Sequence, residues 1–423
     1  MPVDAWIAGV VFLVAYLLIA IEPFDRTLIA LIAGLLVILL GVIDQEGALA
    51  AVDWNVILLL AGMMIIAGIL ARTGLFEWVA IRAVRLSDGH PIRLMLLLAA
   101  TTAIASAVLD NVTTVILTVP ITLVVTRRLG VSPVPYLIVM VLASNIGGTA
   151  TLIGDPPNIM IASAAGLGFE DFLINLAPVA VVTFIAMALL MVAAFRNHLE
   201  IPTERREAAL EATEAATITD RPMLARALVV LGVTLAGFLF HRMLGLEPAT
   251  IALFGATVLM VICRVDPHDA FREVDWRTLF FFIGLFVLVE SLVQAGIIAG
   301  VAQSFADHAA GDPTLASLSL LWISGGLSAI IDNIPYTATA IPVVEHLVAQ
   351  GMPAEPLWWS LALGACLGGN LTLVGASANV VVANLALAAG HRIGFFEFLR
   401  YGAVVTIVSL LISTIYIWLR YLA

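Results

Sequence analysis

The clearest indication of the fold is the stretch Ser-Asn-Ile-Gly-Gly-Thr-Ala-Thr-Leu-Ile-Gly-Asp-Pro-Pro-Asn, residues 144–158. It interrupts a long apolar segment with paired glycines and paired prolines, neither of which continues a helix comfortably. A helix broken at membrane depth frees carbonyl groups at one end and N–H groups at the other, and protein or water must satisfy them. Free carbonyls suit cations, and a helix N-terminus suits anions or polar oxyacids. The stretch therefore predicts a discontinuous membrane helix that lines a binding site.

The chain carries this pattern twice. Residues 367–379, Leu-Gly-Gly-Asn-Leu-Thr-Leu-Val-Gly-Ala-Ser-Ala-Asn, repeat it 221 positions later, and Asp110-Asn111 returns as Asp332-Asn333 after 222 positions. Two related halves with polar interruptions at matching places are typical of secondary transporters, whose site lies at the interface of the repeats. The offset of 222 also relates identical single residues of the two halves, namely Asp53 and Asp275, Gly62 and Gly284, Gly74 and Gly296, and Pro120 and Pro342.

The composition excludes an ordinary soluble protein. The chain of 423 residues is 62% apolar and 12% charged, whereas soluble domains are about 25% charged. Apolar runs of about 18 residues recur from end to end, which predicts a polytopic helical membrane protein. The first run, residues 6–21, is too long for a signal-peptide core and is expected to be a retained transmembrane helix. Only two cysteines are present, Cys263 and Cys366, so we expect no disulfide framework, no metal site and no cofactor. We also expect no nucleic-acid partner.

We expect an all-α polytopic membrane protein built as an inverted-topology repeat of two five-helix halves. Each half is expected to contain a re-entrant hairpin with two short arms and a discontinuous helix. The first repeat covers residues 1–195 with its hairpin at 94–126, a link covers 196–223, and the second repeat covers 224–423 with its hairpin at 316–347. The ten spans are expected at residues 4–21, 26–43, 54–71, 134–165, 174–195, 224–241, 248–263, 276–297, 357–389 and 401–419.

The arginines predict the orientation. All 19 basic residues are arginines. With the link in the cytoplasm, every arginine except Arg242 and Arg420 falls on the cytoplasmic side, as the positive-inside rule requires. The expected external loops at 44–53, 166–173, 298–315 and 348–356 contain no basic residue. Both termini are then outside, and because five is an odd number of spans, the second half is inverted relative to the first.

The polar residues at the two hairpin tips and the two helix breaks form the candidate site. An ionisable side chain in a membrane segment is costly and is therefore a functional hypothesis. Asp110 and Asp332 are expected to bind the coupling ion, with a helix cap as the alternative. Asp155, whose counterpart is Ala376, either binds the ion or caps the half-helix that the prolines begin. No catalytic residue is expected, and the predicted substrate- or ion-binding residues are Asp110, Asn111, Thr113, Thr114, Asn145, Gly147, Gly148, Thr149, Asp155, Asn158, Asp332, Asn333, Thr337, Gly369, Asn370, Thr372, Ser377 and Asn379.

Other acids are expected to be structural. Asp53 and Asp275 stand at the entrances of spans, where an aspartate caps a helix. Glu290, within the eighth span, has no acidic counterpart in the first half and is expected to form a satisfied pair or to lie at the membrane interface.

At these segments the chain resembles the ion transporter superfamily, in particular the arsenite permease and sodium–proton antiporter group and its relative the P protein. The resemblance rests on residues 144–158, 332–335 and 367–379 and covers nearly the whole chain. It implies ion-coupled transport and an inverted-repeat homodimer with a scaffold and a moving transport domain. Sodium–dicarboxylate symporters are more distantly similar, but they carry Ser-Asn-Thr at each hairpin tip. Here Asp110-Asn111 and Asp332-Asn333 stand in its place, and their carboxylates would repel a dianionic substrate.

The leading hypothesis is a proton-coupled arsenite or antimonite efflux permease of the cell inner (plasma) membrane, working by alternating access. The neutral oxyacid would be bound by Asn145, Thr149, Asn370 and Thr372, while Asp110 and Asp332 would exchange the protons. The partners are therefore a small inorganic substrate, the coupling H⁺, the lipid bilayer and a second copy of the chain.

Three alternatives stay open. One is a sodium–proton antiporter with Asp110, Asp155 and Asp332 as cation ligands, and another is an anion transporter of the P-protein kind. A passive channel is the alternative from a different class. An enzyme is not expected, because Asp155 follows Leu152-Ile153-Gly154 rather than the Gly-x-Gly of intramembrane aspartyl proteases, and no His-Glu-x-x-His sequence exists.

Overall fold

The structure is a computed structural model that describes residues 3–21, 23–196 and 218–423, and every regular element in these ranges is a helix. The predicted link at 196–223 lies largely outside the described residues. The helices of the first half are α1 (Val3–Ile21), α2 (Arg26–Leu39), α3 (Gln45–Ala50), α4 (Trp54–Ala71), α5 (Leu75–Leu86), α6 (Pro91–Val108), α7 (Asn111–Leu129), α8 (Val134–Thr149), α9 (Pro156–Ala165), α10 (Phe169–Asn175) and α11 (Ala177–Phe195). Those of the second half are α13 (Arg221–Leu244), α14 (Pro248–Cys263), α15 (Pro267–Phe271), α16 (Trp276–Gln294), α17 (Ile297–Ala309), α18 (Pro313–Ile331), α19 (Asn333–Ala349), α20 (Ala354–Gly368), α21 (Ser377–Ala388), α22 (Phe395–Ile417) and the π-helical turn η1 (Trp418–Leu422).

Nine helices of the described part are long and apolar enough to cross a membrane. They are α1, α4, α6, α7, α11, α13, α16, α18 and α22 together with η1. The chain is therefore an all-helical, multi-pass membrane protein, as predicted.

The hairpin arms are longer than predicted. Helices α6 and α7 have 18 and 19 residues, and α18 and α19 have 19 and 17. The first arms begin at Pro91 and Pro313, outside the apolar windows, because proline is favoured in the first turn of a helix. The prediction of short arms is therefore wrong, and the re-entrant path itself stays a prediction. Short helices also occupy expected external loops, since α3 lies within 44–53, α10 overlaps 166–173 and α17 overlaps 298–315.

The two halves pack on each other through a pair of equivalent helix crossings. Helix α4 packs against α14, and α16 packs against α2. A Cβ atom at Gly62 would lie 2.8 Å from the carbonyl carbon of Ala252, and one at Gly284 would lie 2.5 Å from that of Ala30. Only glycine permits this backbone approach. The repeated pair Gly62 and Gly284 therefore marks where the helices of one half cross those of the other.

Other repeated residues end or begin helices, as predicted. Asp53 caps α4 by accepting from Asn55 N and Val56 N, and Asp275 caps α16 by accepting from Thr278 N. Glu290 accepts a hydrogen bond from Gln294 at 3.1 Å, which agrees with the expected satisfied pair.

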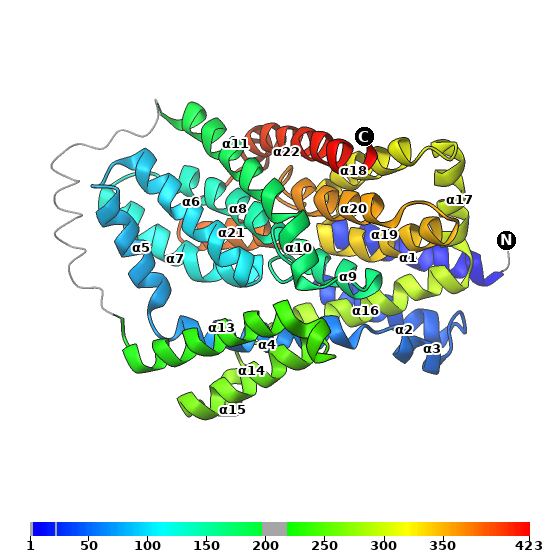
Figure 1. The fold of residues 1–423 in the computed structure, drawn as a ribbon, viewed down its shortest axis with the longest axis horizontal. Coiled ribbons are helices and arrows are strands. Elements are labelled where there is room, and N and C mark those ends of the chain that lie inside the picture. Colours follow the sequence, from blue (N-terminus) through cyan, green and yellow to red (C-terminus); the bar gives the residue numbers. More distant parts are fainter. Residues whose placement is uncertain (1–2, 22, 197–217) are drawn as a thin grey trace.

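The broken helices lie in the interior. Figure 1 shows α4, α13 and α14 along one edge of the molecule and α11 and α22 along the opposite edge, with α8 and α20 between them. Residues 136–149 of α8 and residues 356–368 of α20 are all buried. Helix α8 stops at Thr149 and α9 begins at Pro156, while α20 stops at Gly368 and α21 begins at Ser377. Both breaks thus occur at the predicted places and are surrounded by other helices.

Candidate functional site

Each helix break is held by one asparagine that follows it. The Asn158 side-chain amide donates to Thr151 O at 2.8 Å and to Thr149 O at 3.2 Å. In the second half, the Asn379 amide donates to Gly369 O and Thr372 O, both at 2.8 Å. Burying an unpaired carbonyl is costly. These two predicted site residues therefore satisfy the carbonyls that the breaks expose, rather than pointing into an open site.

Each break also rests on the first arm of its own hairpin. Thr151 Oγ1 donates to Ala107 O at 2.6 Å, and Thr372 Oγ1 donates to Ala329 O at 2.5 Å. The first glycine of each pair is explained by the same contact between the break and the hairpin arm. A Cβ atom at Gly147 would clash with the backbone of Ala103 in α6, and one at Gly368 would lie 2.5 Å from the backbone oxygen of Gly325 in α18. Glycine is required here because two helix backbones touch.

The two hairpin tips are helix caps. Asp110 accepts from Thr113 N at 2.8 Å at the start of α7, and Asp332 accepts from Ile334 N at 3.0 Å at the start of α19. The capping alternative is thus present at both tips. The tips differ in backbone, since φ is −68° at Asp110 and +75° at Asp332.

Asp155 lies where the two tips and the first break meet. Its carboxylate is fully buried and accepts from Asn111 Nδ2 at 3.1 Å and from Asn333 Nδ2 at 3.1 and 3.2 Å. One asparagine comes from each hairpin tip. Asp155 precedes α9 but makes no side-chain capping hydrogen bond, so its alternative role as a helix cap is wrong. Among the described hydrogen bonds and ion pairs, this carboxylate receives neutral amides and no cation.

An amide network joins this point to the second break. Asn145 Oδ1 accepts from Asn111 Nδ2 at 3.4 Å, and Asn145 Nδ2 donates to the side-chain oxygens of Asn370 and Asn379 at 2.9 Å each. All four side chains are buried. The structure therefore brings together predicted residues from all four polar segments.

The predicted threonines are less central. Thr149 and Thr337 donate to carbonyls of their own helices, those of Asn145 and Asn333. Thr113 lines a cavity beside Asp110, whereas the hydroxyl of Thr114 is buried without a hydrogen-bond partner in the described structure. Only Thr113 among these is placed to meet a solute in this conformation.

Sequence reasoning missed Arg26. Its Nη1 donates to Asp332 Oδ2 at 3.0 Å and to Ser377 Oγ at 2.7 Å, and Ser377 Oγ donates to the same Asp332 oxygen at 2.7 Å. Arg26 looks like an ordinary cytoplasmic arginine in the sequence, because it stands at the first position of a helix. No local signal connects it to a residue 306 positions away.

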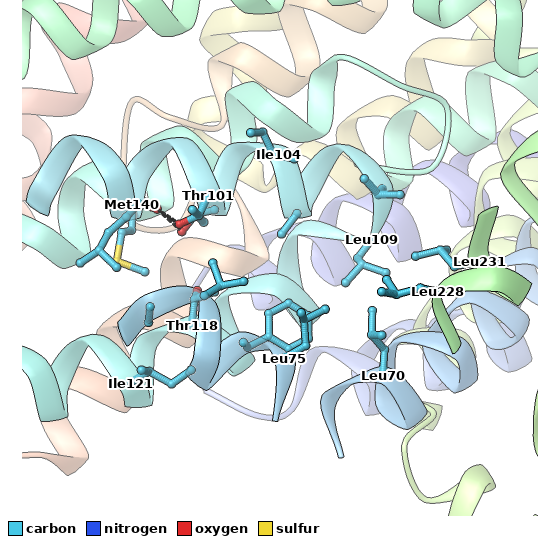
Figure 2. A pocket seen from close by; sticks show the side chains of 17 residues that line it. Leu70, Leu75, Thr101, Ile104, Leu109, Thr118, Ile121, Met140, Leu228 and Leu231 are labelled. Carbon is cyan, nitrogen blue, oxygen red and sulfur yellow. Dashed lines mark hydrogen bonds between the residues drawn. The ribbon is translucent and has the colours of Figure 1, made fainter. Parts of the chain in front are cut away.

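Two adjoining cavities reach residues at the edge of the site, and neither is lined by Asp155 or by the amide network. One of about 140 Å³ is lined by Asp110, Thr113 and Ser377. The other, of about 680 Å³, is lined by Arg26, Arg277 and again Ser377. A different cavity of about 330 Å³, drawn in Figure 2, is almost wholly apolar and is lined by none of the predicted site residues. The polar pair of cavities is therefore the candidate path of the solute.

Comparison with known proteins decides the family. The family model described as citrate transporter matches residues 16–364. The chain belongs to the citrate transporter family. It is accordingly a secondary transporter and not an enzyme.

Several relatives match over nearly the whole chain. A 46 kDa membrane protein of Mycobacterium leprae is 44% identical over 98% of this chain and 99% of its own length. An uncharacterized transporter of Mycobacterium tuberculosis is 45% identical over 98% of both chains. The human P protein is 33% identical over 97% of this chain, which spans 59% of that longer protein. The predicted kinship with the P protein is therefore confirmed.

A solved structure supports the fold. The YdaH transporter of Alcanivorax borkumensis superposes with a TM-score of 0.57, covering 88% of this chain and 86% of its own, at 18% identity. At this identity the likeness concerns the fold alone. It agrees with an all-helical transporter architecture.

Proposed function

We propose that this transporter exports a small neutral oxyacid, arsenite or antimonite, by alternating access driven by the proton gradient. The observation that carries the proposal is the Asp155 carboxylate, which is fully buried and held by the asparagines of both hairpin tips. A buried carboxylate without a counter-charge is costly, so a bound proton or cation stabilises it. Because its two asparagine partners come from different repeats, a change in the charge of Asp155 alters a hydrogen bond at each hairpin tip.

The arrangement supports Asp155 as the main proton-exchanging group. The sequence favours Asp110 and Asp332 for this role. In the structure, however, Asp332 is paired with Arg26, and both tip aspartates cap helices. Asp155 has no described ion pair and its side chain caps no helix. Its protonation therefore breaks neither kind of contact.

The charge around the path supports a neutral cargo. Asp110, Glu273 and Asp275 line the smaller cavity, and among these acids only Glu273 has a described ion pair, with Arg72 at 2.8 Å. Carboxylates repel anions, whereas amide and hydroxyl groups suit a neutral molecule that both donates and accepts hydrogen bonds. The amides of Asn145 and Asn370 currently bond to each other, and an oxyacid can replace that bond with equivalent ones.

A carboxylate such as citrate is the second candidate. The family description favours it, and so do Arg26 and Arg277 in the larger cavity. Guanidinium groups bind carboxylates with two parallel hydrogen bonds. Each arginine is already engaged by an aspartate, Asp332 or Asp25, which counts against this candidate.

Everted membrane vesicles test the proposal. We expect arsenite accumulation that depends on an imposed proton gradient, that disappears in Asp155→Asn, and that persists in the control Asp312→Asn, a cap on the exposed end of α18. Accumulation of citrate instead of arsenite would establish the second candidate. Proton release on addition of Na⁺, without arsenite uptake, would replace both with sodium–proton exchange. The homodimer and the orientation stay predictions, which cross-linking and labelling of the termini would test.

A further inference from the structure

Arg26, Asp332 and Ser377 form a closed triangle of hydrogen bonds beside the larger cavity, which Arg26 and Ser377 line. The three distances are 3.0, 2.7 and 2.7 Å. The guanidinium of Arg26 also lies over the ring of Phe281 at 5.3 Å, which fixes its orientation. A guanidinium flanked by a carboxylate and a hydroxyl has the arrangement of an occupied carboxylate-binding site. Here the carboxylate belongs to the protein itself.

The pairing joins separate parts of the fold. Arg26 begins α2, which packs against α16, whereas Asp332 and Ser377 begin α19 and α21 of the second half. The other arginine of this cavity, Arg277, is paired with Asp25. Both guanidinium groups that line the described part of the cavity are therefore already neutralised by an aspartate.

The repeat does not explain the triangle. Asp110 is the counterpart of Asp332, but Pro248 stands where the first half has Arg26. Asp332 also adopts φ +75°, a backbone conformation that most L-residues avoid and that persists only where surrounding contacts hold it. Ile334 N, Ser377 and Arg26 all bond to its carboxylate. The carboxylate is thus held on Arg26 at the expense of local backbone strain.

We propose that Asp332 is a tethered anion that keeps free oxyanions off Arg26 and so sets the charge selectivity of the transport path. The proposal deepens the function proposed above, because it assigns selectivity for neutral or cationic cargo to the same path. With the charge of Asp332 removed, Arg26 and Ser377 form a vacant site for a carboxylate or phosphate group. The adjoining cavity of about 680 Å³ gives such an anion room.

Equilibrium binding of citrate and of inorganic phosphate to the purified full-length chain tests this selectivity. Asp332→Asn is the decisive variant, since asparagine has nearly the same shape, caps helices and tolerates positive φ. We expect this variant to bind citrate about tenfold or more tightly than the wild type does. One new charge-assisted pair between Arg26 and a carboxylate of the ligand accounts for a gain of this size. The double variant Arg26→Gln/Asp332→Asn should lose this gain. Asp312→Asn, which makes the same change at another helix cap, should leave the affinity unchanged.

Two results would overturn the proposal. One is folded Asp332→Asn protein, judged by its gel-filtration profile and melting temperature, that binds citrate no better than the wild type. The other is a gain that survives loss of Arg26. If the double variant does not fold, Ser377→Ala/Asp332→Asn takes its place and should show a smaller gain than Asp332→Asn alone. Because binding needs no transport, a wild type that fails to move arsenite would remove the proposed function and leave this test intact.

Discussion

The two hairpin tips share the same capping and amide contacts but differ in charge. Both aspartates cap the second arm, both following asparagines donate to Asp155, and both neighbouring breaks are held by an equivalent asparagine. Yet the second tip carries a fixed counter-ion in Arg26, and only the first break carries an acid, since Ala376 stands opposite Asp155. The repeated residues thus build the framework, and the residues that do not repeat distinguish the chemistry of the two halves.

This comparison implies that changes to the shared framework should act equally in both halves, whereas changes to the charges should not. The largest expected effect concerns the backbone contact of each break. Gly147→Ala and Gly368→Ala should each destabilise the protein by about 3 kcal/mol or more, because the new methyl group meets the backbone of α6 or α18. The yield of monodisperse protein and its thermal unfolding measure this.

Gly326→Ala is the matched control for these glycines. It lies in α18, and nothing is within 4 Å of the added atom. If only one of the two break glycines proved sensitive, the breaks would not be structurally equivalent.

The second effect separates the acids. Asp155→Asn should reduce proton-driven uptake by roughly 100-fold, the upper range for coupling between two sites. Asp110→Asn should reduce it much less, since asparagine caps a helix as well as aspartate and Asp110 bonds mainly to Thr113 N. Initial uptake rates in vesicles distinguish the two. Equal losses would return Asp110 to the central role that the repeat alone suggests.

The third effect compares the asparagines that hold the breaks. Asn158→Ala and Asn379→Ala should each cost about 2 kcal/mol, because each removes the amide that donates to the buried carbonyls of its break. Asn379→Ala should cost more, since the Asn379 oxygen accepts from the Asn145 amide at 2.9 Å, whereas the Asn158 oxygen accepts from the weaker thiol donor of Cys366 at 3.4 Å. Thermal unfolding in detergent, with the exposed Asn55→Ala as control, gives the order. A larger cost at Asn158 would contradict the described network.

The smallest effect concerns the repeated glycines Gly74 and Gly296, which begin α5 and α17 with φ of +78° and +75°. Alanine at either position should cost about 1 kcal/mol for the left-handed backbone. Gly74→Ala should cost slightly more, because its Cβ atom would lie 2.9 Å from Thr219 Oγ1, whereas Gly296 has open space. The same unfolding assay measures both, and the helical Gly300→Ala, which also has open space, should not destabilise the protein.

Much of the framework follows from local sequence rules. Paired glycines and prolines break helices wherever they stand, and aspartates before polar or apolar runs cap them, so the positions of both breaks and the caps at Asp53 and Asp275 were predictable. The length of the hairpin arms was not, because the apolar windows stop before the prolines that begin α6 and α18.

Composition and the internal repeat were enough to predict a membrane-embedded chain whose helices break at two equivalent places, where polar residues gather. Which carboxylate is ion-paired and which receives only uncharged donors depends on the packing of distant helices. Arg26 meets Asp332 across 306 positions, and Asn333 meets Asp155 across 178. Helix breaks and caps depend on neighbouring residues, whereas these pairings depend on how packed helices bring distant residues together, and no local pattern encodes that.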